Sequence, residues 1–474
     1  MAEKHFKYLA DKGNPIGEVT AVNRFLVQAR GLHPINEHAL VLFEDGSKGI
    51  VRAVAEEYVS ILHLGRDSLS VGTGVVLQHH ELVTKVGTNF IGRVISVNGA
   101  PLDGKGPIAA DTVWPVFNVA PPLIGRLQLS DQLETGITLI DSLFPLVLGQ
   151  RMAMLGDSKS GKSSLMAQLT INQKDTGRVV VYAMIAKRRA DVDTLISKLE
   201  ATGAIKHSIV VVSTMFDSLA VSYLAPYVAC AIAEFLWQEK QIDTIVIYDD
   251  LSAHAHVHRE ISLLAEVSPG RDSYPGDMFY SHSSLLERAG RLKSTQKTLT
   301  ALPLVHTPGG DITAYLPTNI MSITDGQYIL DMDLFHEGIR PAISTGLSVS
   351  RVGGYGQNDR QKNIAGRVFK HLAKYQQAKE FSHFGSELAL EVKDDLEMGK
   401  KLFEVFRQGP EEVFSLNAQQ LMLEAVLSSD KNTMLDISAM KASVHEVAKK
   451  ITDDASFKVA YQELLSKSVM EIKR

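Results

Sequence analysis

The fold is decided by the stretch MAMLGDSKSGKSSLMA, residues 152–167. It begins with an apolar run, continues with the pattern G-x-x-x-x-G-K-[ST], and ends in a segment of helical character. This order of strand, glycine-rich loop and helix is typical of a phosphate-binding loop. Gly156 and Gly161 let the backbone bend, so that its N–H groups surround phosphate oxygens at the positive end of the helix. We call residues 156–163 the phosphate loop.

The chemistry of the phosphate loop predicts ATP or ADP as its ligand, with Mg²⁺ as the counter-ion. We expect Lys162 to reach the outer phosphates and the Ser163 hydroxyl to ligate Mg²⁺. Nucleotide binding is therefore assigned to the loop and the residue after it: Gly156, Asp157, Ser158, Lys159, Ser160, Gly161, Lys162, Ser163 and Ser164.

A second Mg²⁺ ligand is expected farther along the chain. The apolar segment from Thr244 to Tyr248 predicts a strand, and Asp249 and Asp250 follow it directly. An acidic residue after a strand is often a helix cap. The phosphate loop upstream favours a carboxylate of the Mg²⁺ shell instead, and we assign that role to Asp249.

Length and composition indicate a multi-domain globular protein. The chain has 474 residues, of which 45% are hydrophobic and 22% charged, and this length predicts about three domains. The net charge of -5 does not indicate the positively charged surface that binds nucleic acid or a membrane. Cys230 is the single cysteine, which excludes an intrachain disulfide and a thiolate zinc cluster. The polar start and the lack of a long uninterrupted apolar run predict no insertion into a membrane.

Three regions differ in their sequence pattern. Residues 1–74 contain short apolar segments with alternation and a hairpin signal at Asp45-Gly46, which predict a small β-barrel. Residues 75–358 alternate β-rich runs with helix-length stretches, which predicts a parallel α/β sheet with phosphate-loop chemistry. Its expected strands cover residues 178–183, 208–212, 244–248 and 300–304. In residues 359–474 an all-α domain is expected, because apolar side chains recur at helical spacing: Ile364, Val368, Leu372 and Tyr375.

Several longer strings make nearly the whole chain resemble the alpha subunit of F-type ATP synthase, in a somewhat diverged form. They are GRV (92–94), DGKGPI (103–108), YLAPY (223–227), YDDLS (248–252), PGRDSYPGD (269–277), PTN (317–319), DGQ (325–327), GIRPAI (338–343) and GLSVSRVG (346–353). The resemblance implies a barrel, a RecA-like nucleotide-binding domain and a helical C-terminal domain. It also implies an alternating hexamer with catalytic beta-type subunits around a central gamma-type shaft.

The resemblance further implies a place in the F1 sector of a proton-translocating ATP synthase. Such a complex lies on the cytoplasmic face of the cell membrane, or on the equivalent face of an organellar inner membrane. The N-terminal extension through which the family reaches the peripheral stalk looks shortened here, since little precedes Gly17.

Two positions separate the role of this chain from that of a beta subunit. Beta chains carry a glutamate that positions the attacking water, shortly after the strand that follows the phosphate loop, and alpha chains carry a glutamine. In the segment YAMIAKR, 182–188, Ala186 is assigned to that position, and its side chain can neither accept a proton nor orient water. We therefore expect ATP binding without appreciable hydrolysis.

Arg351 is assigned a catalytic role in trans. In alpha subunits the arginine of this string points into the site of the neighbouring beta subunit, where a guanidinium stabilises charge on the transferring phosphoryl group. Near the purine, the resemblance places Arg340, Pro341 and Gln408. Pro410 and Lys159 depart from the family pattern, which puts adenine selectivity and affinity in question.

Two other functions share the barrel-plus-RecA layout. A self-sufficient homohexameric ATPase of the secretion or flagellar type would need a catalytic glutamate in this chain, and Ala186 argues against it. A hexameric RNA translocase would need an aromatic and basic surface on the barrel, which the sequence does not show. The histidines in AHAHVH, 253–258, are read as a partly exposed helix face, and Cys230 as a buried small side chain.

Overall fold

The computed structural model describes residues 2–65, 68–382, 390–429 and 435–469, and the chain forms two compact units. The first unit is made of Met1–Gln128, Lys174–Thr307 and Asp311–Thr324. The second is made of Leu129–Gln173, Pro308–Gly310 and Asp325–Arg474. The phosphate loop belongs to the second unit, and Asp249 belongs to the first.

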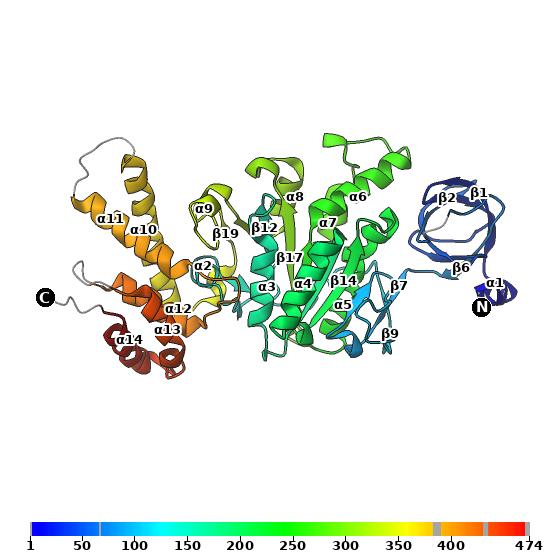
Figure 1. Ribbon diagram of the computed structural model, residues 1–474. Coiled ribbons are helices and arrows are strands. Elements are labelled where there is room, and N and C mark those ends of the chain that lie inside the picture. Colours follow the sequence, from blue (N-terminus) through cyan, green and yellow to red (C-terminus); the bar gives the residue numbers. More distant parts are fainter. Residues whose placement is uncertain (1, 66–67, 383–389, 430–434, 470–474) are drawn as a thin grey trace. The chain divides into compact units, whose positions relative to one another are not determined.

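A closed six-stranded barrel begins the first unit, after helix α1 (Ala2–Asp11). Its strand order is β1-β2-β5-β4-β3-β6, at the blue end of the chain in Figure 1. The strands are β1 (Ile16–Asn23), β2 (Leu26–Arg30), β3 (Leu40–Phe43), β4 (Lys48–Val54), β5 (Val59–His63) and β6 (Gly74–His79). Val27, Ala29 and Phe43 are fully buried inside it. At the predicted hairpin between β3 and β4, the Asp45 carboxylate accepts a hydrogen bond from the Ser47 N–H at 2.8 Å.

A parallel sheet forms the core of the rest of the first unit. Its order is β8 (Val94–Ser96), β14 (Ser208–Thr214), β13 (Val179–Lys187), β15 (Thr244–Asp249) and β17 (Thr298–His306). The four strands expected from the sequence are confirmed as β13, β14, β15 and β17. Strand β16 (Gly290–Arg291) pairs antiparallel with β17, and β7 (Val83–Val86) pairs with β9 (Thr112–Pro115). The parallel strands are nearly continuous apolar runs because both of their faces are buried.

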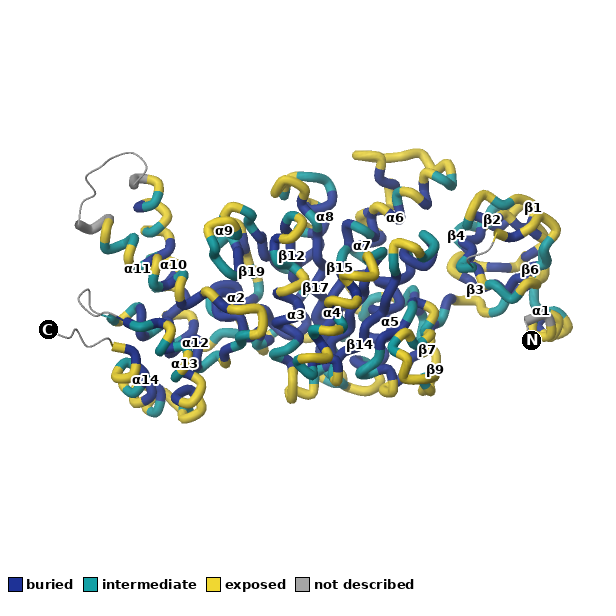
Figure 2. Tube along the Cα trace, in the orientation of Figure 1, coloured by how far each residue is buried: buried dark blue, intermediate teal, exposed yellow. Residues whose placement is uncertain are grey.

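Helix α5 (Leu219–Gln238) is the central helix of this unit. It packs against β13, β14 and β15 and is dark blue over most of its length in Figure 2. Its length and composition alone would suit a membrane span, but 89% of its apolar window is buried inside the unit, as in a core helix. The other helices are α4 (Arg189–Ala201), α6 (Leu251–Leu264), α7 (Met278–Leu286) and α8 (Tyr315–Ile323), with 3₁₀ turns at Thr88–Phe90, Leu123–Gly125, Ala204–His207 and Arg271–Ser273.

The second unit contains a smaller sheet and the C-terminal helices. The sheet order is β12 (Ala153–Gly156), β18 (Gly326–Ile329) and β19 (Val349–Ser350), beside the ribbon of β10 (Gln132–Leu133) and β11 (Leu146–Val147). Its helical elements are α2 (Thr138–Leu143), α3 (Lys162–Asn172), α9 (Met332–His336), the 3₁₀ turns Pro308–Gly310 and Gly353–Gly356, α10 (Asp359–Ser382), α11 (Leu390–Phe406), α12 (Leu416–Leu427), α13 (Ile437–Ala448) and α14 (Asp454–Ser468).

Helices α10 to α14 form the all-α region, drawn from gold to dark red in Figure 1. Ile364, Val368 and Leu372 are buried on one face of α10, as their spacing predicts. The predicted fold class, a barrel followed by an α/β nucleotide-binding region and a helical region, is confirmed. The boundaries at 74/75 and 358/359 stay predictions, and strand β6 runs across the first of them.

Candidate functional site

The phosphate loop has the backbone that its glycines predict. Buried strand β12 ends at Gly156, where a Cβ would lie 2.6 Å from the Ser160 hydroxyl oxygen and 2.9 Å from Cβ of Leu330. Gly161 has a φ of 102° and immediately precedes α3. The N-cap residue of that helix is Gly161, which has no side chain, so the loop lies at the positive end of the helix dipole. The loop therefore fits an anion such as a phosphate group.

Lys162 and Asp157 hold the loop together. Lys162 Nζ donates hydrogen bonds to the carbonyl oxygens of Gly156 at 2.7 Å and Asp157 at 2.8 Å. The Asp157 carboxylate accepts from the N–H of Gly309 at 2.9 Å. The Ser163 hydroxyl lies on an exposed residue in the first turn of α3. The ammonium group thus lies over the loop, and Ser163 lies on the exposed first turn of the helix that follows.

A cavity of about 470 Å³ adjoins the phosphate loop within the second unit. Its lining combines Ser160, Gly161 and Ser164 of the loop region with the three residues that the resemblance placed near the purine: Arg340, Pro341 and Gln408. The rest of the lining is Leu165, Gln168, Phe335, Ala342, Arg407, Gly409 and Pro410. The size and the mixture of apolar and polar groups are typical of a small-molecule site.

Arg340 and Gln408 line the cavity, and their polar groups form hydrogen bonds with the backbone of the chain. The Arg340 guanidinium lies 3.4 Å from the centroid of the Phe335 ring and donates to the carbonyl oxygens of Phe335 and Ile339. Gln408 is 6% exposed, and its side-chain oxygen accepts from the N–H of Thr138 at 2.6 Å. Its amide nitrogen donates to the carbonyl of Gly136 at 2.9 Å. Phe335, which no sequence motif marks, is the aromatic residue in the lining of the cavity.

In the first unit, Asp249 ends β15 and is 5% exposed. Lys187, at the end of the neighbouring strand β13, places its Nζ 2.5 Å from Oδ1 of Asp249 and 2.9 Å from Oδ2 of Asp250. Burial lowers the pKa of Lys187, but the two carboxylates raise it by more, so the pKa lies above the ordinary lysine value. Asp249 is therefore paired with a cation from the chain itself, and its assignment to the Mg²⁺ shell stays a prediction.

Ala186 lies one residue before Lys187, and its contacts are a backbone hydrogen bond and apolar packing. Its N–H donates to the Ser213 hydroxyl at 2.9 Å, and its side chain packs against an apolar cluster that includes Leu26 and Leu62. Lys187 was not singled out from the sequence. Its carboxylate partners follow from strand pairing, since β13 and β15 are parallel neighbours.

Arg351 follows the short strand β19 and is exposed. Its N–H donates to the Asp325 carbonyl at 3.0 Å, and the Asp325 carboxylate pairs with Arg151 at 2.8 Å. Beside Arg351, Leu347 is 49% and Tyr355 62% exposed. The backbone at Arg351 is thus fixed, and the side chain stands on a surface that also presents apolar groups.

The histidines of α6 divide between the two sides of the helix. His256 is exposed, as a partly exposed helix face predicts, whereas His254 is fully buried and His258 is 5% exposed. His254 Nδ1 lies 3.1 Å from Nε2 of His282, and its Nε2 lies 3.1 Å from the Tyr223 carbonyl oxygen. They are buried because α6 packs against α5, which the spacing of α6 alone does not reveal. Within the described ranges, no group of three or more histidine, cysteine or acidic residues is arranged to hold a metal ion.

Two family models match the chain. Residues 136–350 match the nucleotide-binding domain of the ATP synthase alpha/beta family. Residues 357–472 match the C-terminal domain of the ATP synthase alpha/beta chain. Together they cover the phosphate loop, the cavity and Asp249, and the first match ends one residue before Arg351.

Similar proteins cover most of the chain. ATP synthase subunit alpha of Dehalococcoides mccartyi is 40% identical, over 87% of this chain and 83% of that protein. The same subunit of Caldanaerobacter subterraneus is 40% identical, over 87% and 82%, and that of Helicobacter pylori is 38% identical, over 89% and 84%. The chain therefore belongs to the ATP synthase alpha/beta family as an alpha subunit, part of a complex that makes or hydrolyses ATP.

Proposed function

We propose that the chain binds ATP or ADP without hydrolysing it and contributes Arg351 to the active site of a neighbouring beta-type subunit. Nucleotide binding is supported by one observation above all: the phosphate loop and the cavity of about 470 Å³ are continuous through Ser160, Gly161 and Ser164. The loop would hold the phosphates, while Phe335, Arg340 and Pro341 would enclose the base. Mg²⁺ would accompany the nucleotide at the Ser163 hydroxyl.

The lack of hydrolysis is inferred from the end of β13. Neither the methyl group of Ala186 nor the ammonium group of Lys187 can accept a proton from water, which is the task of the beta-type glutamate. A homohexameric secretion-type ATPase needs such a base in every chain. For that reason the alpha-type function is preferred to the self-sufficient motor.

The role of Arg351 is supported by its exposure and its fixed backbone. A guanidinium presented in trans to a phosphoryl group can increase turnover by roughly 10³ to 10⁵. The exposed apolar residues Leu347 and Tyr355 would be covered by the neighbouring subunit.

The assembly proposed is an alternating hexamer with beta-type subunits around a gamma-type shaft, with a peripheral stalk as a further partner. It would lie on the cytoplasmic face of the cell membrane, or the equivalent organellar face, as the F1 sector of a proton-translocating complex. No nucleic acid partner is proposed, because the net charge is -5.

The proposal is tested with the purified chain. Binding of a fluorescent ATP analogue is measured by titration, and phosphate release is measured with and without a beta-type partner. The chain alone should bind nucleotide and release almost no phosphate. Lys162→Ala should weaken binding at least about tenfold, because it removes the ammonium group that reaches the phosphates. The control is Lys206→Ala, which removes an exposed lysine of the other unit. Brisk phosphate release by the isolated chain would contradict the proposal.

A further inference from the structure

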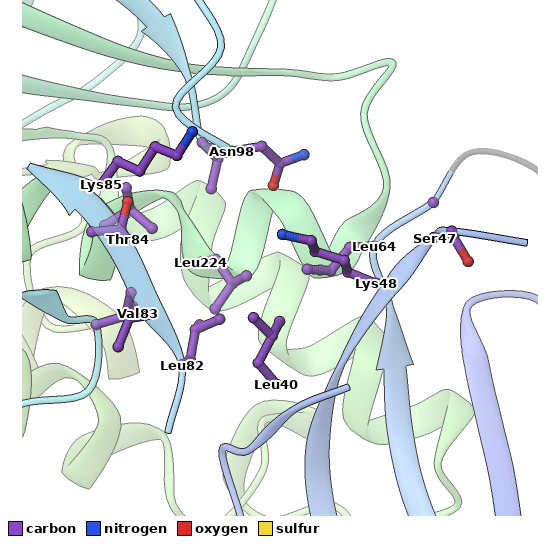
Figure 3. Close-up of a pocket in the computed structure, with 15 residues that line it drawn as sticks. Leu40, Ser47, Lys48, Leu64, Leu82, Val83, Thr84, Lys85, Asn98 and Leu224 are labelled. Carbon is purple, nitrogen blue, oxygen red and sulfur yellow. The ribbon is translucent and has the colours of Figure 1, made fainter. Parts of the chain in front are cut away.

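A second cavity, of about 380 Å³, lies entirely within the first unit, whereas the phosphate loop belongs to the second. Strands β3 and β4 of the barrel, strand β7 and helix α5 all contribute to its wall (Figure 3). Cavities that hold small molecules in proteins usually measure roughly 300 to 1,000 Å³. The size of this cavity therefore suits a small ligand, and the proposed function leaves it unused.

One part of the wall is apolar. Leu40 of the barrel, Leu82 before β7 and Leu224 of α5 are all buried, and Val97 and Val116 are buried as well. The three leucines lie together at the base of the view in Figure 3. Because burial of apolar surface is favourable, this part of the wall suits an apolar group of a ligand.

The other part of the wall carries two lysines. Lys48 begins strand β4 and Lys85 lies in β7, so the two ammonium groups come from different elements of the unit. Both residues are exposed, and Figure 3 shows their side chains beside the Asn98 amide, above the leucines. Thr84 adds a hydroxyl group to the lining, and none of the described residues that form it is acidic. This end of the cavity is therefore polar and positively charged.

Electrostatics at the polar end favours an anion. Burial lowers the pKa of Lys48, and the positive charge of Lys85 lowers it further. The two ammonium groups are thus close enough to repel one another, and an anion between them would replace this repulsion by two attractions. Lysine commonly binds phosphate groups as a point charge, and two lysines match an anion with two charges.

We infer that this cavity binds a small organic anion with two negative charges on an apolar body, such as a phosphate monoester. Lys48 and Lys85 hold the anionic group, Thr84 and Asn98 offer it hydrogen bonds, and the buried leucines enclose the apolar body. Since the wall includes barrel strands and α5, the ligand contacts both parts of the unit at once. The inference does not rest on nucleotide binding at the phosphate loop.

The test uses phenyl phosphate, which joins a doubly charged group to an apolar ring. The full chain is acetylated at its lysines with an amine-reactive ester at a series of phenyl phosphate concentrations, and each lysine is followed by peptide mass spectrometry. Phenyl phosphate should slow the acetylation of Lys48 and Lys85 severalfold, because the bound anion covers both amines. The exposed Lys206 of the same unit should react at an unchanged rate. Lys162 reports binding at the phosphate loop separately.

Variants and comparison compounds locate the two halves of the site. Lys48→Gln and Lys85→Gln should each weaken the protection of the remaining lysine at least about tenfold, because one charge-assisted contact is lost. Lys206→Gln is the matched control and should protect like the wild type. Inorganic phosphate lacks the apolar body and benzyl alcohol lacks the charge, so both should protect much less than phenyl phosphate.

Three results would overturn the inference: no protection of Lys48 and Lys85 by phenyl phosphate, equal protection by inorganic phosphate, or an effect of only one of the two lysine variants. Failure of ADP to protect Lys162 would instead contradict the proposed function. Protection of Lys48 and Lys85 would still decide whether the cavity of the first unit binds an organic anion.

Discussion

The polar side chains of Gln408 and Arg340, which line the cavity beside the phosphate loop, are hydrogen-bonded to backbone groups of the chain. The resemblance places Gln408 near the purine. In the structure its side-chain amide forms hydrogen bonds with the backbone of Thr138 and Gly136. Arg340 was assigned there too, and its guanidinium lies against Phe335. Sequence motifs could predict that these residues lie near the phosphate loop. They could not predict the hydrogen bonds, because the partners of Gln408 are about 270 positions away in the chain.

Replacing Arg351 by alanine should separate binding from trans-activation. Nucleotide affinity of this chain should remain unchanged, since Arg351 does not line the cavity. Turnover of the complex with a beta-type partner should fall by roughly 10³ or more, because the transition state loses a guanidinium. The measurements are analogue titration of the isolated chain and steady-state phosphate release of the complex.

The control for Arg351→Ala is Arg189→Ala, because the Arg189 side chain is 85% exposed and makes only a long ion pair of 3.8 Å with Asp193. Arg189→Ala should leave both the nucleotide affinity of the chain and the turnover of the complex unchanged. Equal turnover in the Arg351→Ala and wild-type complexes would show that this arginine has no part in the reaction.

Among the secondary structure elements, α6 and α7 carry a buried histidine cluster. Burial lowers the pKa of His254, with smaller contributions from His282 and His258. Burial, assisted by His258, lowers the pKa of His282 to about 3. Burial also lowers the pKa of His258, against the opposing effect of Asp277. All three imidazoles are therefore neutral in the folded protein near neutral pH.

This cluster predicts a loss of stability in mild acid. A histidine whose pKa in the folded state is below its unfolded value of about 6.5 contributes fully to the free energy of unfolding above pH 6.5. This stabilisation is lost as the pH falls. From pH 6.5 to pH 5, each fully buried histidine should cost about 2 kcal/mol of unfolding free energy. Urea unfolding at a series of pH values measures this. His282→Gln should flatten the profile, and a profile parallel to the wild type would refute the assignment.

Elements differ in how far the sequence predicts them. The phosphate loop was predicted from residues 152–167 because strand, loop and helix are contiguous and their chemistry is local. The bulge before Lys187 was not predicted, since it depends on the pairing of β13 with β14. The burial of His254 was missed for a similar reason, because it depends on packing between helices. Local patterns carry no information on such long-range pairings.

The whole molecule has an architecture that composition and periodicity indicated well: a barrel, an α/β region and a helical end. How the sequence is divided between compact units was not foreseen, because the first unit joins the barrel to segments on both sides of the phosphate loop. Compactness is a property of contacts between distant segments. The domain boundaries at 74 and 358 stay predictions from the sequence pattern.

Assembly should cover the surface around Arg351. Leu347, Val349 and Tyr355 are 49%, 43% and 62% exposed in the isolated chain, and exposed apolar groups of this kind are commonly buried between subunits. Hydroxyl-radical footprinting of the chain alone and with a beta-type partner should show protection of these side chains on mixing. Tyr8, which is 52% exposed on α1, provides the comparison and should remain reactive. Equal reactivity of Leu347 and Tyr355 in both samples would argue against this interface.

The single cysteine has a practical consequence for the study of motion in the assembled motor. Cys230 is 1% exposed on α5, and burial raises the pKa of its thiol to about 12. A maleimide dye reacts with an accessible thiolate, which Cys230 does not offer in the folded state. The native chain thus serves as an unreactive background for labelling. A cysteine introduced at Tyr8, which is 52% exposed and is expected to stay exposed on assembly, would carry one dye per subunit, and distance changes during turnover could be followed without first removing the natural thiol.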